Sequence, residues 1–194
     1  MKQVTIIDYG AGNLASVMFA LKRMGIEPVL TSDPDVLIKA EKVIFPGVGH
    51  AVAAMDALKA KGLDIVIPKL ICPVLGICLG MQLMCTHSQE GNVAGLGIFN
   101  EIVYQFEQSL KVPHMGWNTV FKLSDPLFSG ISEHSSVYFV HSYYVPVSKY
   151  TSAASYYGKA FSAALQKDNF YAVQFHPEKS GIIGEQILEN FIKI

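Results

Sequence analysis

Short runs of consecutive apolar residues recur along the chain, and the first four alternate with segments of helical periodicity. The runs are Val4–Ile7, Pro28–Leu30, Lys42–Phe45, Pro73–Ile77, Val137–Val140 and Tyr171–Phe175. Unbroken runs of this length are typical of strands that are covered on both faces. Strands that alternate with helices at this spacing predict a mainly parallel central sheet with helices on both faces, which is an α/β fold.

The helical segments place apolar residues three and four positions apart. We expect helices over Asn13–Met24, His50–Lys61, Leu79–His87 and Gly181–Ile192. Asp33-Pro34 is typical of a helix N-cap followed by the first turn. From Gly97 to Ala164 the pattern changes to hairpin-like strands, which we interpret as an antiparallel extension of the same sheet. No linker or repeat divides the chain, so we expect one domain over 1–194.

Composition narrows the class of protein. Half of the residues are hydrophobic (51%) and 16% are charged, which indicates a core-forming chain rather than a disordered one. The net charge of -1 argues against binding to nucleic acid or to an anionic membrane. No run reaches the roughly 18 apolar residues that would span a bilayer, and the N-terminal apolar stretch is short for a signal peptide. We therefore expect a cytoplasmic protein.

The three cysteines lie close together in the sequence, at Cys72, Cys78 and Cys85. An odd number of cysteines argues against a disulfide framework in a reducing compartment. Their spacing differs from the CxxC pairs of zinc ribbons, so we expect no structural metal. We interpret Cys72 and Cys85 as packing residues, which leaves Cys78 as a candidate nucleophile.

Cys78 stands in the pentapeptide Gly76–Gly80 (GICLG). A predicted strand enters it and a predicted helix leaves it, as in the strand–nucleophile–helix elbow. The two flanking glycines fit a turn too tight for side chains, and the helix N-terminus favours a thiolate. The backbone N–H of Leu79 is placed to receive an oxyanion. A small buried cysteine in a glycine-rich turn is the alternative interpretation.

A base and an acid for this nucleophile follow the last predicted strand, in His176-Pro177-Glu178. Catalytic groups gather at the carboxyl ends of parallel strands, where Cys78 and His176 both fall. On an irregular turn, the carboxylate of Glu178 can fold back onto the imidazole. Alone, this motif fits a capping histidine and a solvated glutamate equally well. Together with the elbow it predicts a Cys–His–Glu triad.

The loop Pro46–Gly49 (PGVG) follows another predicted strand. Glycines on both sides of Val48 let its peptide planes rotate. At a strand end beside the elbow, this loop is placed to supply a second oxyanion donor. Taken alone, it is an ordinary turn.

The segment Gly10–Ala15 (GAGNLA) fits the dinucleotide-binding fingerprint, with Asp33 about twenty residues further on. A nucleotide site would leave Cys78, His176 and Glu178 unexplained, so we reject it. The other histidines lack metal-ligand spacing, and we expect surface or hydrogen-bonded roles for them. They are His50, His87, His114, His134 and His141.

The motifs GICLGMQ (Gly76–Gln82), VQFHPEK (Val173–Lys179) and PGVG (Pro46–Gly49) resemble, in order and over the whole length, the class I (triad-type) glutamine amidotransferases. Asp8–Asn13 (DYGAGN) and Pro113–Asn118 (PHMGWN) look like segments of the glutaminase subunits of histidine biosynthesis. The resemblance implies a flavodoxin-like class I glutamine amidotransferase fold. It also implies hydrolysis of glutamine to glutamate and ammonia without a metal or an organic cofactor.

The resemblance implies a role for individual residues. Cys78 would be the nucleophile, His176 the general base and acid, and Glu178 the orienting carboxylate. The oxyanion hole would consist of Gly47, Val48, Gly49 and Leu79, and the glutamine site of Gln82, His141, Ser142 and Tyr143. The positions that match an interface are Asn13, Trp117, Tyr138 and Lys179. The implied partner is a (β/α)8-barrel cyclase subunit that receives the ammonia within a heterodimer.

Three alternatives remain open at this point. A glutaminase subunit of anthranilate or pyridoxal phosphate synthesis is disfavoured by the PGVG and PHMGWN segments. A thiol peptidase or esterase of similar fold would need a groove for an extended substrate. A binding module without activity has no reason to keep three convergent reactive groups. The lone Trp117 fits either a core or an interface position.

Overall fold

The computed structural model describes residues 3–10, 14–124 and 126–194. The strands are β1 (Val4–Ile7), β2 (Val29–Thr31), β3 (Lys42–Gly47), β4 (Val74–Cys78), β5 (Cys85–Ser88), β6 (Val93–Ala94), β7 (Phe99–Gln105), β8 (His114–Thr119), β9 (Ser136–His141), β10 (Tyr143–Tyr144), β11 (Thr151–Tyr157), β12 (Lys159–Lys167) and β13 (Phe170–Val173). The helices are α1 (Leu14–Arg23), α2 (Pro34–Ile38), α3 (Ala51–Ala60), α4 (Leu63–Val66), α5 (Leu79–Leu83) and α6 (Gly181–Lys193), with 3₁₀ turns η1 (Ile67–Lys69), η2 (Pro126–Phe128) and η3 (Pro177–Lys179).

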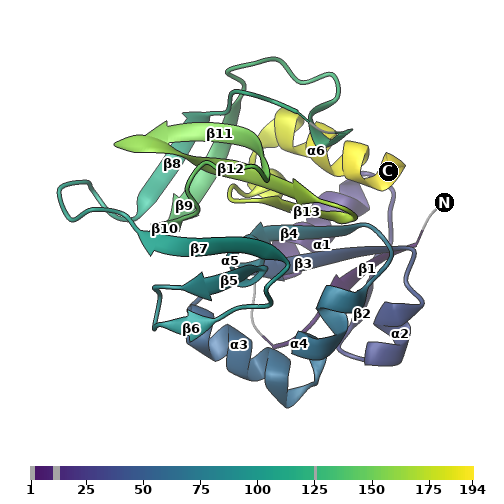
Figure 1. Cartoon of the computed structure of the whole chain (residues 1–194). Helices are drawn as coiled ribbons and strands as arrows, with labels where there is room; N and C mark the ends of the chain where they lie inside the picture. The colour runs from purple at the N-terminus through teal and green to yellow at the C-terminus, as the bar shows by residue number, and fades with distance from the viewer. Residues whose placement is uncertain (1–2, 11–13, 125) are drawn as a thin grey trace.

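Over these described residues, a seven-stranded sheet forms the centre, in the order β11-β12-β13-β4-β3-β1-β2 (Figure 1). The strands from β13 to β2 pair in parallel, whereas β11 and β12 pair antiparallel at one edge. The predicted parallel sheet is therefore confirmed. Its carboxyl ends place the Gly47 end of β3 directly beside the Cys78 end of β4.

The central strands are buried on both faces because alternate residues enter two separate cores. Ile6 and Ile44 lie in one core together with residues of α1 and α6. Ile7 and Phe45 lie in the other core, together with residues of α2, α3 and α4. Figure 1 shows α6 on one side of the sheet and α2, α3 and α4 on the other. Burial on both faces explains the unbroken apolar runs of the sequence.

The predicted helix over Leu79–His87 is wrong in its second half. Helix α5 ends at Leu83, and Cys85–Ser88 forms the strand β5. The reason is tertiary: Ile98 and Phe99 donate backbone N–H groups to Met84 O, and β5 then pairs in parallel with β7. A helical continuation would lose this pairing.

The single antiparallel extension predicted for Gly97–Ala164 is also only partly correct. Strands β11 and β12 do extend the main sheet, but β10-β7-β5-β6 form a separate four-stranded sheet and β8-β9 a separate hairpin in the described part of the chain. The capping prediction at Asp33 is confirmed, since its carboxylate accepts a hydrogen bond from Asp35 N at 2.9 Å. Among the described residues, no helix is both long and apolar enough to cross a membrane.

Candidate active site

Cys78 ends β4 in a backbone conformation that is rare for a residue with a side chain, with φ 54° and ψ -109°. Such a conformation costs about 1–3 kcal/mol and persists only where the surroundings impose it. The neighbouring glycines allow the close packing that does so. A Cβ on Gly80 would lie 2.0 Å from Phe45 O, and one on Gly76 would lie 2.8 Å from the Met84 sulfur. The elbow predicted from the sequence is present.

The loop after β3 lies against this elbow. Gly47 is the register partner of Cys78 across the β3–β4 ladder, and a Cβ on Gly47 would lie 2.7 Å from Gly80 N. Gly49 has φ +100°, a conformation that favours glycine. Val48 and Gly49 face the same cavity as Cys78 and Leu79. The structure therefore brings the two predicted oxyanion segments together.

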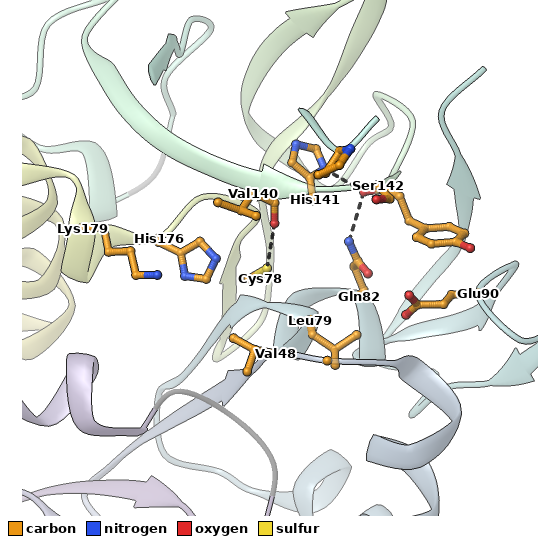
Figure 2. Close-up of a pocket in the computed structure, with 13 residues that line it drawn as sticks. Val48, Cys78, Leu79, Gln82, Glu90, Val140, His141, Ser142, His176 and Lys179 are labelled. Carbon is orange, nitrogen blue, oxygen red and sulfur yellow. Dashed lines mark hydrogen bonds between the residues drawn. The ribbon is translucent and has the colours of Figure 1, made fainter. Parts of the chain in front are cut away.

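His176 follows β13, and its backbone N–H donates to Tyr138 O at 2.9 Å. Its Nδ1 lies 2.8 Å from Glu178 Oε1, and both side chains are buried. A carboxylate can only accept, so Nδ1 carries the proton and Nε2 is the nitrogen left for Cys78. Figure 2 shows the imidazole beside Cys78.

The electrostatic surroundings of His176 favour its protonated form. Burial lowers the pKa of His176, but the hydrogen bonds to Cys78 and Glu178 and the negative charges of these groups raise it, and the net pKa lies above the ordinary value. The second oxygen of the Glu178 carboxylate is buried and accepts no hydrogen bond from the described residues. The charge of this carboxylate therefore acts mainly on His176.

The opposite side of the site is formed by β9 and the turn into β10. Val140 O lies 3.7 Å from the Cys78 sulfur. Gln82, from α5, donates one amide N–H to Tyr143 O at 3.1 Å (Figure 2). Its other amide N–H donates to Gln174 Oε1 at 2.9 Å. The carbonyl oxygen of Gln82 is the end of the amide that remains for a ligand.

These elements enclose a cavity of about 450 Å³. Its lining consists of Val48, Gly49, Cys78, Leu79, Gln82, Glu90, Pro113, Val140, His141, Ser142, Tyr143, His176 and Lys179. Of the residues predicted for catalysis and substrate binding, Glu178 and Gly47 lie behind this lining, and the others form part of it. Trp117 and Tyr138 lie outside the cavity, and Asn13 lies outside the described residues.

Glu90 also lines the cavity, although no feature of the sequence predicts it there. Its Oε2 accepts a hydrogen bond from Ala51 N at 2.8 Å. Burial raises the pKa of Tyr143, and the negative charge of Glu90 adds to this shift. A carboxylate at the cavity wall suits a ligand with an ammonium group. No motif marks Glu90, and the segment before it was expected to be helical. Only the fold shows that it faces the cavity.

Two of the residues expected at an interface, Trp117 and Tyr138, lie on one outer face. Trp117 is 59% exposed, which excludes a core position, and Met115 on the same side of β8 is 62% exposed. Tyr138 lies opposite Trp117 in the hairpin, with ring centroids 5.9 Å apart. Ile182, at the start of α6, is 83% exposed. Lys179 lies between this face and the cavity that it lines.

A cysteine at a strained elbow of an α/β sheet, beside a histidine bonded to a buried acid, is the arrangement expected of a thiol-dependent acyl-transfer enzyme. The comparison with known families makes this class specific. Residues 5–194 match the model of the glutamine amidotransferase class-I family, and the chain belongs to this family. It is therefore an enzyme of the glutamine amidotransferase class.

Individual relatives are similar over their whole length. The imidazole glycerol phosphate synthase subunit HisH of Bacteroides fragilis is 58% identical over 99% of this chain and 100% of its own length. The subunit of the same name from Escherichia coli is 49% identical over 98% of this chain and 99% of its own. The structure of PurLQS from Thermotoga maritima has a TM-score of 0.76 at 18% identity, and the match covers 100% of this chain and 99% of that one. This last likeness concerns the fold alone.

Proposed function

We propose that this chain is the glutaminase subunit of an imidazole glycerol phosphate synthase. The observation that carries the proposal is the cavity in which Cys78, the His176–Glu178 pair and the Ser142–Tyr143 turn converge. Full-length similarity to subunits named HisH supports this assignment over other glutaminase subunits. Membership of the glutamine amidotransferase class-I family disfavours a peptidase.

In the first half of the proposed reaction, the Cys78 thiolate attacks the side-chain amide carbon of glutamine. The N–H of Leu79, at the N-terminus of α5, meets the oxyanion, together with a rotated peptide of the Gly47–Gly49 loop. Protonated His176 gives its proton to the amide nitrogen, the C–N bond breaks and ammonia leaves. Glu178 stabilises the imidazolium and keeps Nδ1 protonated. A glutamyl thioester remains on Cys78.

In the second half, water attacks the thioester carbon while neutral His176 accepts a proton from it. The C–S bond then breaks, which releases glutamate and restores the thiolate beside a protonated His176. Gln82, Ser142 and Tyr143 hold the amino-acid end of glutamine, and Glu90 faces its ammonium group. No step of this cycle requires a metal or an organic cofactor.

The proposed partner is a (β/α)8-barrel cyclase subunit that forms a heterodimer with this chain in the cytoplasm. It would bind the face of Trp117, Tyr138 and Lys179, to which we add Met115 and Ile182. Exposed apolar side chains of this size are typical of an interface core. Ammonia would pass into the barrel, where imidazole glycerol phosphate and an aminoimidazole carboxamide ribotide are formed.

The test is glutamine hydrolysis by the chain alone and with the cyclase subunit. We expect a low rate alone and a rise of about 10²–10³-fold in the complex, because one missing oxyanion donor accounts for such a factor. Cys78→Ala in the complex should abolish glutamine-dependent product formation, while an added ammonium salt should still support it. Cys72→Ala is the matched control and should behave as wild type. Glutamine turnover by Cys78→Ala would contradict the proposal.

A further inference from the structure

A line of hydrogen bonds leads from β8, outside the cavity, to the backbone of the cavity wall. Asn118 Nδ2 lies 3.2 Å from His114 Nε2. His114 Nδ1 lies 2.9 Å from His141 Nε2, and His141 Nδ1 lies 2.7 Å from Tyr143 O. His141 and Tyr143 line the cavity, whereas His114 and Asn118 do not. The triad mechanism gives no role to either of these two.

The direction of each hydrogen bond follows from the final acceptor. The carbonyl of Tyr143 can only accept, so Nδ1 of His141 carries the proton. Nε2 of a neutral His141 is then an acceptor, and His114 must donate to it through Nδ1. Nε2 of His114 is an acceptor in turn, and it receives an N–H of Asn118. The whole line therefore donates in one direction, from Asn118 towards Tyr143.

The amide of Asn118 is oriented independently of the histidines. Its Oδ1 accepts from Thr119 N at 2.8 Å, and Nδ2 donates to Tyr156 O at 2.9 Å. If the amide turned over, its oxygen would face Tyr156 O and its nitrogen would face Thr119 N. The remaining N–H of Asn118 thus points at His114 in the orientation that the line requires.

The surroundings keep both imidazoles neutral, as a line of donors and acceptors requires. The His114 ring stacks on Tyr157 with centroids 4.1 Å apart, and Phe106 lies 5.3 Å from the His141 ring. Burial lowers the pKa of His114 to about 4. Burial lowers the pKa of His141 to about 3; the hydrogen bond to Tyr143 O opposes this shift, and the charges of His114 and His176 add to it.

The end of the line fixes the turn that faces the substrate. Tyr143 O accepts from His141 and from Gln82 Nε2, while Ser142 O accepts from Phe106 N at 3.1 Å. Both carbonyl oxygens of this turn therefore accept hydrogen bonds from protein donors. Figure 2 shows the bond from Gln82 to this turn. Bonded in this way, the two carbonyl oxygens are oriented towards protein donors, which favours the carboxylate of an amino-acid substrate because oppositely turned carbonyl oxygens would repel it.

We propose that His114 and Asn118 are positioning residues, which act through the protonation pattern of His141 to hold the Ser142–Tyr143 turn in the orientation that binds the amino-acid end of glutamine. In the other tautomer of His141, the lone pair of Nδ1 would face Tyr143 O, and the peptide would rotate away. The inference rests on the proposed function for the identity of the substrate. The direction of the hydrogen bonds does not depend on it.

The first arm of the test reads the tautomers directly. Long-range proton–nitrogen correlation spectra of the chain with ¹⁵N-labelled histidine, recorded at pH 7, should show His114 and His141 as neutral rings protonated at Nδ1. The signals are assigned by their loss in the His114→Phe and His141→Gln variants. A ring protonated at Nε2, or a doubly protonated ring, at either position overturns the proposal.

The second arm measures glutaminase kinetics in the complex with the cyclase subunit. His114→Phe keeps an aromatic ring on Tyr157 but removes the donor, so the KM for glutamine should rise about five- to tenfold with kcat nearly unchanged. His114→Asn loses the ring but keeps an N–H near the position of Nδ1, so its KM should stay near wild type even though the protein unfolds at a lower temperature. A merely structural His114 would give the opposite order of KM values.

Equal KM values in all three proteins, or a higher KM for His114→Asn than for His114→Phe, overturn the proposal. A wild-type complex without glutamine hydrolysis would contradict the proposed function instead. In that case the tautomer spectra still decide whether the hydrogen bonds run from Asn118 to Tyr143.

Discussion

The two walls of the cavity are built by different means. The first wall consists of the Gly47–Gly49 loop, the Cys78 elbow and His176, and the second consists of Val140–Tyr143. The first wall relies on strained backbone, with Cys78 at φ 54° and glycines packed against Phe45 O and Gly80 N. The second relies on hydrogen bonds from side chains to the carbonyl of Tyr143.

The buried histidines of the two walls differ in the same way. His176 has a raised pKa because Cys78 and Glu178 favour its protonated form. His141 has a lowered pKa because it is buried among neutral groups and lies near other imidazoles. A charged imidazole is placed where bonds break, and a neutral one is placed where a substrate is held. Changes to the first wall should therefore act on kcat, and changes to the second on KM.

The largest effect should come from Glu178→Gln. This change removes the charge that holds Nδ1 of His176 protonated, and kcat for glutamine in the complex should fall about 10²–10⁴-fold with little change in KM. Glu185→Gln on α6, which breaks the exposed contact with Arg23, is the matched control. Equal kcat values for the two variants would contradict the inference that changes to the first wall act on kcat.

The packing of the first wall is tested by Gly80→Ala. The added methyl would meet Phe45 O at 2.0 Å, and backbone cannot retreat cheaply, so the free energy of unfolding should drop by about 3 kcal/mol. Gly76→Ala meets the end of the flexible Met84 side chain at 2.8 Å and should cost about 1 kcal/mol. Urea denaturation of both variants measures the difference. A larger loss for Gly76→Ala would contradict the packing argument.

Gln82 connects the two walls, since it belongs to α5 and donates to Tyr143 O and Gln174 Oε1. Gln82→Leu has a similar volume but leaves both acceptors without this donor. We expect the KM for glutamine to rise about tenfold and the unfolding free energy to fall by about 1–2 kcal/mol. Gln186→Leu, which removes a bond to Asn190 on α6, should lower stability without changing KM. A decrease in kcat without a change in KM would show that Gln82 acts together with the first wall.

The most gradual effect is a dependence of stability on pH from the second wall. The folded chain keeps His114 and His141 neutral down to pKa values of about 4 and about 3, whereas both protonate near 6.5 when unfolded. Between these values the unfolded chain binds more protons at these two positions, so their contribution to stability should fall as the pH is lowered, by up to about 1.4 kcal/mol per pH unit for each ring. His176, whose pKa is raised in the folded chain, contributes the opposite slope near pH 7.

Urea denaturation at pH 7, 6 and 5 measures this slope. His141→Gln should reduce the slope by the share of one ring, whereas Gln186→Leu, which changes no titratable group, should leave it unchanged. If the unfolding free energy of His141→Gln depended on pH as steeply as that of the wild type, other groups would cause the pH dependence.

The sequence by itself determined the first wall. Apolar runs set the parallel strands, because a strand buried on both faces needs them. Three motifs form this wall, and each consists of residues that are neighbours in the sequence. They are the elbow around Cys78, the PGVG loop and the His176-Pro177-Glu178 segment. Local backbone chemistry, such as the glycines around Cys78, is therefore visible in the sequence. The predicted helix beyond Leu83 failed where a distant strand, β7, competed for the same backbone groups.

Only the tertiary structure decided the second wall. Gln82 and Tyr143 are 61 positions apart, and His114 and His141 are 27 apart, yet each pair shares a hydrogen bond. A histidine in the sequence carries no sign of whether it will be charged or neutral. That state depends on burial and on the acceptors that face its two nitrogens. Glu90 could not be identified for the same reason, because a lone carboxylate gains its place at the cavity only when β5 and β7 pair.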